Sequence, residues 1–140
     1  MNEQLTKLLE FHRTFGTHIE NEPSAEIPDD VIAIRMKLLQ EELDEYKVAA
    51  QGRDLIAVSD ALTDLLYVLL GTYVSHGLQD FAEALFDEVH RSNMSKLDEN
   101  GHPVLRDDGK VLKSPHFIAP DLEKILSQPR QAPRREQLYD

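Results

Sequence analysis

The sequence contains no cysteine and no tryptophan, and only 6% of its 140 residues are aromatic. Without cysteine, the chain has no disulfide, no thiolate nucleophile and no cysteine-based zinc site. Basic residues are also scarce, since 15 Lys and Arg stand against 26 Asp and Glu, which gives a formal net charge of −11. This charge argues against binding to a nucleic-acid backbone or to an anionic membrane surface.

No leader and no long apolar segment is expected from the sequence. Residues 1–16 include acidic side chains and no apolar stretch of signal-peptide length. The longest apolar run, residues 65–74, is expected to be too short and too interrupted to span a bilayer. A chain of 140 residues suits one domain with a core of its own. We therefore expect a soluble, cytoplasmic protein.

Hydrophobic periodicity predicts four main helices, over residues 2–16, 29–52, 54–75 and 79–94. The first has apolar residues three and four positions apart and Gly16 as its stop. The third is apolar most of the way round, which is typical of a buried, central helix. The predicted fold class is all-α, with these four helices forming a bundle.

The C-terminal third of the sequence has a different character. Turn signals at residues 99–101 and 107–109 predict a loop or a small hairpin. A short closing helix is expected over residues 119–128, because Pro120 and Asp121 suit a first helical turn. We expect one domain over residues 1–127 and a flexible tail over residues 128–140.

Two aspartates stand out in the third predicted helix. Asp64 directly precedes the apolar run, and Asp60 lies four residues before it, so the two share a helix face. A carboxylate buried there must be neutralised, paired with a base or bound to a metal ion. Either aspartate alone has a simpler explanation: Asp60 as an exposed acid, and Asp64 as a partner for an arginine.

The second predicted helix repeats this anomaly. Its apolar stripe passes through Val31, Ile34 and Leu38, Glu42 and Glu45 occupy the next positions of the same arc, and Val48 and Ala49 resume the stripe. The alternative is a solvated acidic face. Two facing helices would bring four or five carboxylates together, and such charges repel unless a divalent cation sits among them. Oxygen ligands alone indicate Mg²⁺, or Mn²⁺, rather than zinc.

Four segments together resemble the all-α nucleoside triphosphate pyrophosphohydrolase superfamily, which includes MazG-like, phosphoribosyl-ATP pyrophosphohydrolase-like and dimeric dUTPase-like proteins. They are EELDE (41–45), DALTDLLYVLLG (60–71), EVHRSNMSK (88–96) and DGKVLKSP (108–115). The resemblance covers roughly residues 5–126. It implies an all-α nucleotide pyrophosphatase fold and an enzyme that hydrolyses acid anhydrides.

The resemblance also implies roles for the acids. The family has Glu-Glu-x-x-Glu on one helix and Glu-x-x-Asp on the next. Ala61 stands where the first acid of the second pattern belongs, so Asp60 is the available substitute. The implied catalytic residues are Glu41, Glu42 and Glu45, and the implied metal ligands are Glu42, Glu45, Asp60 and Asp64. Glu41 is expected to activate water or to bind a further metal.

Substrate contacts are implied for a set of basic and polar residues. They are Arg91, Asn93, Lys96, Lys110, Lys113 and His12. For each lysine the alternative is a solvated surface charge, and for His12 it is a packing or hydrogen-bonding role.

The implied reaction is cleavage between the α and β phosphates of a nucleotide, which releases a monophosphate and pyrophosphate. A deoxyribonucleoside triphosphate such as dUTP is expected as the substrate, with phosphoribosyl-ATP as the alternative. A di-iron site normally needs two Glu-x-x-His motifs, which the sequence lacks. A non-enzymatic acidic helical module is the remaining alternative. Surplus apolar surface on the third and fourth helices, and the resemblance, imply a homodimer or higher oligomer.

Overall fold

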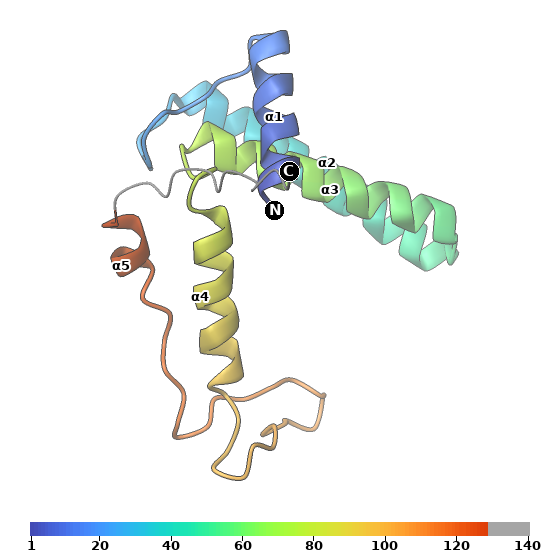
Figure 1. Ribbon diagram of the computed structural model, residues 1–140. Helices are drawn as coiled ribbons and strands as arrows, with labels where there is room; N and C mark the ends of the chain where they lie inside the picture. The colour runs from blue at the N-terminus through green and yellow to red at the C-terminus, as the bar shows by residue number, and fades with distance from the viewer. Residues whose placement is uncertain (129–140) are drawn as a thin grey trace, which may run out of the picture. The chain divides into compact units, whose positions relative to one another are not determined.

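Five α-helices and no β-strand occur in residues 1–128, the part of the chain that the structure, a computed structural model, describes (Figure 1). The all-α fold class is thus confirmed. Residues Met1–Asp80 form one compact unit, which contains three of the helices. A second unit begins at Phe81 and contains the other two.

The first unit is built on two long helices, α2 (Asp29–Gly52) and α3 (Leu55–Ser75). Only two residues separate them, so the helices turn back and lie side by side (Figure 1). Arg53 takes the left-handed conformation that ends α2, with φ 54°. Asp54 then caps α3, because its carboxylate accepts hydrogen bonds from the backbone N–H groups of Ile56 (2.9 Å) and Ala57 (3.2 Å). The tight turn fixes which residues of α2 face which residues of α3.

Helix α1 (Asn2–Phe15) packs on α3 and ends at Gly16, as predicted. Leu5 and Leu8 are buried on its inner side, and Val74 of α3 is fully buried. A loop joins α1 to α2 and is pinned to the end of α3, since the Ser24 carbonyl accepts from Nδ1 of His76 (2.8 Å). Gly77, with φ 70°, touches this loop so closely that a Cβ would overlap the Glu22 backbone.

Helix α3 is more exposed than its apolar sequence predicts. By length and composition alone it could cross a membrane, contrary to the expectation from the sequence, although a core helix of a globular protein passes the same test. Much of its leucine surface is uncovered in the single chain. The side chains concerned are Leu55, Leu62, Leu66 and Leu69, which are between 42% and 75% exposed.

The second unit contains α4 (Ala82–Met94) and α5 (Leu122–Leu126), which pack on each other. Between them the chain makes the two predicted turns, with Gly101 and Gly109 at φ 77° and 84°. Isolated β-bridges flank these turns, so this segment is a loop with two tight turns rather than a hairpin of paired strands.

Two expectations about the wider organisation stay predictions. Three of the four predicted bundle helices belong to the first unit and α4 belongs to the second, and each unit is compact by itself. The four-helix bundle and the single domain over residues 1–127 are therefore not tested. The predicted tail lies outside the described residues, apart from Gln128.

Candidate functional site

Asp64 is exposed on α3, so the expectation of a buried carboxylate at this position is wrong. Leu62 and Leu66, on either side of it in the sequence, are also largely uncovered, at 47% and 50% exposed. Pairing with an arginine does not explain Asp64 either. In residues 1–128, the arginines that form ion pairs are Arg91 and Arg106, and their partners are Glu88 and Asp108.

Glu42 is the carboxylate that faces inward. It is half-buried on α2, and its Oε2 atom is buried without a hydrogen-bond partner. Burial is the main cause that raises the pKa of Glu42, and four negative charges raise it further, those of Glu45, Asp64, Glu41 and Asp60. The structure therefore gathers all five predicted acids into one electrostatic neighbourhood centred on Glu42.

The buried face of α2 differs from the stripe that the sequence predicts. Ile34 is 45% exposed and Val48 is 71% exposed, so that stripe lies at the edge of the helix pair. The inner face instead follows a seven-residue spacing through Arg35, Glu42 and Ala49. Glu42 is thus correctly assigned to the core-facing side, whereas the assignment of Glu45 to the same side is wrong, because Glu45, like Glu41, is exposed.

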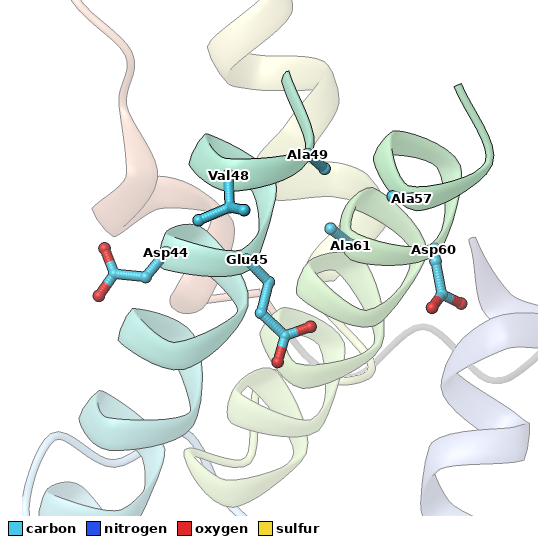
Figure 2. Close-up of a pocket in the computed structure, with 7 residues that line it drawn as sticks. All are labelled: Asp44, Glu45, Val48, Ala49, Ala57, Asp60 and Ala61. Carbon is cyan, nitrogen blue, oxygen red and sulfur yellow. The ribbon is translucent and has the colours of Figure 1, made fainter. Parts of the chain in front are cut away.

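A groove of about 450 Å³ lies between the end of α2 and the start of α3 (Figure 2). Its lining residues are Asp44, Glu45, Val48, Ala49, Ala57, Asp60 and Ala61. Figure 2 shows the Glu45 carboxylate in the space between the helices, whereas the Asp60 carboxylate lies on the side of α3 away from α2. The alanines keep the helices close and leave an apolar floor beside the two carboxylates.

The acids do not form a preassembled metal cage. Within residues 1–128, no three Asp, Glu or His side chains are close enough together to hold an ion. The donor set nevertheless suits a hard divalent cation, because it offers carboxylate oxygens only and includes the unpartnered Oε2 of Glu42. Glu41, Glu45, Asp60 and Asp64 are exposed, and of these the Glu45 carboxylate lies in the space between the helices, whereas that of Asp60 points away from α2.

The predicted substrate residues from Arg91 onward belong to the second unit, where several already have partners. Arg91 donates to Glu88 (2.6 and 2.8 Å), and Lys96 donates to Oδ1 of Asn93 (2.6 Å). Lys113 lies 4.3 Å from the centre of the Phe117 ring, and Lys110 is exposed. These contacts order the unit around α4, and they leave the proposed substrate role untested.

His12 is 1% exposed, which fits the packing role left open by the sequence. Its Nδ1 donates to the His18 carbonyl (2.8 Å), so Nε2 is the acceptor for Nη2 of Arg35 at 3.5 Å. Burial is the main cause that lowers the pKa of His12, and the positive charge of Arg35 lowers it further. The hydrogen bond to the His18 carbonyl acts in the opposite direction and raises the pKa. The ring is therefore neutral at pH 7.

Arg35 is buried, which the sequence did not predict, since the sequence indicates this arginine only as one possible partner of Asp64. It is 7% exposed, and its Nε is buried without a partner. A sequence signal existed, because Arg35 stands seven residues before Glu42 on the same face of a helix. Periodicity does not report, however, that α1 brings His12 against it.

The sequence matches the model of the phosphoribosyl-ATP pyrophosphohydrolase family over residues 8–93, more than half of the chain. The chain therefore belongs to this family. It is a hydrolase acting on acid anhydrides, with a pyrophosphohydrolase-type activity. A search of the curated proteins finds no match. The matched range includes all five acids, His12 and Arg35, and it ends before Lys96.

The raised pKa of Glu42 gives stability a specific pH dependence in the absence of metal. The folded state holds the Glu42 proton more tightly than the unfolded state does, so its stability falls as pH rises above the ordinary value of 4.5. Glu42→Gln removes this loss. In urea titrations with EDTA, the stability advantage of Glu42→Gln over wild type should grow with pH from 4.5 toward neutrality.

Asp44→Asn is the matched control for this measurement. The hydrogen bond from Lys47 is the main cause that lowers the pKa of Asp44. The Asp44 carboxylate therefore stabilises the fold at high pH, and this stabilisation is lost on acidification. The pH dependence of stability that Asp44 contributes is thus opposite in sign to that of Glu42. A Glu42→Gln advantage that is constant across pH would contradict the assignment of Glu42 as the crowded carboxylate.

Proposed function

We propose that this chain hydrolyses the bond between the α and β phosphates of a nucleotide in an Mg²⁺-dependent reaction. The observation that supports this is the buried, unpartnered Oε2 of Glu42, together with the charges of four further carboxylates that raise the pKa of Glu42. Like charges at this density are costly, and a divalent cation removes the cost. Mn²⁺ has the same ligand preferences and is the expected substitute.

The acids divide into ligands and a base. Glu42, Glu45, Asp60 and Asp64 would hold the metal. When bound, Mg²⁺ neutralises phosphate charge and lowers the pKa of coordinated water. Glu41 is held only by an exposed ion pair with Lys37 (3.6 Å), so its carboxylate is available to orient a water molecule and accept its proton. The water oxygen bonds to the α phosphorus as the bond to the bridging oxygen breaks, and pyrophosphate leaves.

The substrate class follows from charge and from the family. In a chain of net charge −11, a polyanion is held only by local cations, which favours a compact nucleotide. The family match favours phosphoribosyl-ATP as the substrate. A deoxyribonucleoside triphosphate such as dUTP is the second candidate, because the segment EVHRSNMSK at residues 88–96 resembles the dimeric dUTPase-like proteins.

Asp64→Asn tests the metal site. The exchange keeps the shape of the side chain and removes one ligand charge, so turnover should fall by about 10²-fold or more while the fold remains intact. The rise in thermal midpoint that millimolar Mg²⁺ gives the wild type should shrink in the variant. The control variant Asp44→Asn changes a residue on the outer side of α2. It should keep both the wild-type turnover and the full Mg²⁺-induced rise in thermal midpoint. A wild-type midpoint that does not respond to Mg²⁺ or Mn²⁺ would refute the metal site.

The reaction is tested by identifying products across phosphoribosyl-ATP, the canonical ribonucleoside triphosphates and the deoxyribonucleoside triphosphates. With Mg²⁺, the expected products are a monophosphate and pyrophosphate, with solvent oxygen in the monophosphate. Release of orthophosphate would overturn the cleavage position. No hydrolysis of any nucleotide would favour the non-enzymatic acidic module.

We also propose that a second copy of the chain covers α3. Leu55, Ser59, Leu62, Leu66, Leu69 and Tyr73 recur at alternating spacings of four and three, the pattern of a coiled-coil seam. The leucines of this seam are exposed in the single chain. A bilayer is a poor alternative partner, because Asp60 and Asp64 lie on the same helix and charged groups are costly in lipid. The proposed state is at least a homodimer.

Leu66→Glu tests the seam. A charge placed in the middle of an apolar interface should weaken association by about 100-fold or more, since a desolvated, unpaired carboxylate costs several kcal/mol. Light scattering after size exclusion should show a dimer for wild type and a monomer for this variant. Met36→Glu, an exposed methionine on α2, is the control and should stay dimeric. A monomeric wild type would contradict the proposal.

A further inference from the structure

Arg35 is a buried cation without an acidic partner. Across residues 1–128 its guanidinium forms no ion pair, and its one hydrogen bond is the long contact of 3.5 Å to His12. Burial lowers the pKa of Arg35, and no carboxylate opposes this. A guanidinium has five N–H donors and stays protonated, so several donors lack a strong acceptor.

The surroundings of Arg35 hold the guanidinium in place. His12 is fixed by the His18 carbonyl and offers only a neutral ring nitrogen. On α3, a Cβ at Gly71 would lie 3.1 Å from Nη1 of Arg35 and 3.1 Å from Nε2 of His12, closer than ordinary packing allows. The glycine therefore makes room for the guanidinium. Three elements, α1, α2 and α3, together position one charge.

A purely structural role explains this arrangement poorly. Leaving a buried guanidinium without a counter-ion costs several kcal/mol, and an apolar side chain of similar size would fill the space without that cost. The chain has 26 acidic residues, yet none pairs with this arginine in the described part. The missing partner is an anion.

The position of Arg35 relative to the acids identifies that anion. Arg35 precedes Glu42 by seven residues on α2, and Gly71 follows Asp64 by seven residues on the antiparallel α3. Glu42 and Asp64 therefore lie at one position along the helix pair, and Arg35 and Gly71 lie at a second position about 10 Å further along it. We call these the carboxylate level and the guanidinium level. Tyr67 lies between Asp64 and Gly71 on α3, is 39% exposed, and packs its ring edge-on against Phe11 of α1, with 5.7 Å between the ring centroids.

We propose that Arg35 binds a phosphate group of the substrate, at the end of the substrate that extends from the carboxylate level toward the N-terminal half of α2. The inference rests on the proposed function, because it takes the substrate to be a nucleotide held at the carboxylates. Guanidinium and phosphate match in geometry, and the pair is strongest where water is excluded. His12 and Gly71 are positioning residues for this contact.

The test measures anion binding without metal and without turnover. In EDTA, inorganic pyrophosphate should raise the thermal midpoint of wild type by several degrees above NaCl of equal ionic strength. Arg35→Met should lose this rise and should be no less stable than wild type without the anion, because an unpaired buried charge has been removed. Arg13→Met removes an exposed arginine next to His12 and should keep the rise.

Arg35→Lys keeps the test decisive if the methionine variant does not fold. Lysine retains the charge but lacks the planar fork, so the apparent affinity for pyrophosphate should fall about tenfold or more. Glu42→Gln should keep or increase the pyrophosphate effect, since it removes a nearby negative charge. Failure of the metal site would instead appear as an absent Mg²⁺ response, with the pyrophosphate response intact.

Two results would overturn the inference. One is a wild type that responds to pyrophosphate no more than to NaCl. The other is an Arg35 variant, methionine or lysine, that keeps the full wild-type response. Loss of dimerisation in Arg35→Met, without any anion response in wild type, would assign the missing counter-ion to a second copy of the chain.

Discussion

Repulsion among the carboxylates around Glu42 is the constraint on which the site depends. It arises because the two-residue turn between α2 and α3 sets Glu42 against the level of Asp64 and Asp60. Within residues 1–128, no lysine or arginine neutralises Glu42, whose second oxygen is buried without a partner. A cluster of this kind is unfavourable in the metal-free chain, and in the proposed metal site that unfavourable energy would become affinity for a divalent cation.

Arg35 and the acids are two parts of one charge arrangement. The acids favour a cation and repel a bare phosphate. The guanidinium of Arg35, two helical turns away, has no carboxylate as an ion-pair partner in residues 1–128 and favours a phosphate. A magnesium-bound nucleotide would satisfy both, since it offers a cation at one level and negative oxygens at the other. Under the proposed function, a chain of net charge −11 would select a polyanionic substrate in this way.

The helices and part of the site could be predicted from the sequence, while the four-helix bundle stays a prediction. Helix periods, the stop at Gly16 and the turns at Gly101 and Gly109 are local properties, and they were predicted correctly. Glu42 was correctly assigned to the inner face. The predicted stripe was wrong at Ile34 and Val48, which are exposed, and correct at Ala49, which is buried, because the rotation of α2 is set by its packing on α3. The Arg35–His12 contact was missed for the same reason, since it joins residues 23 positions apart.

Direct binding of Mn²⁺, followed by the electron paramagnetic resonance signal of the free ion, tests the central claim. Wild type should bind the ion saturably, Glu42→Gln should bind it about tenfold or more weakly, and Asp44→Asn should match wild type. Saturable binding that is the same in all three proteins would place the ion elsewhere. No saturable binding by wild type would contradict the account that these carboxylates form a metal site.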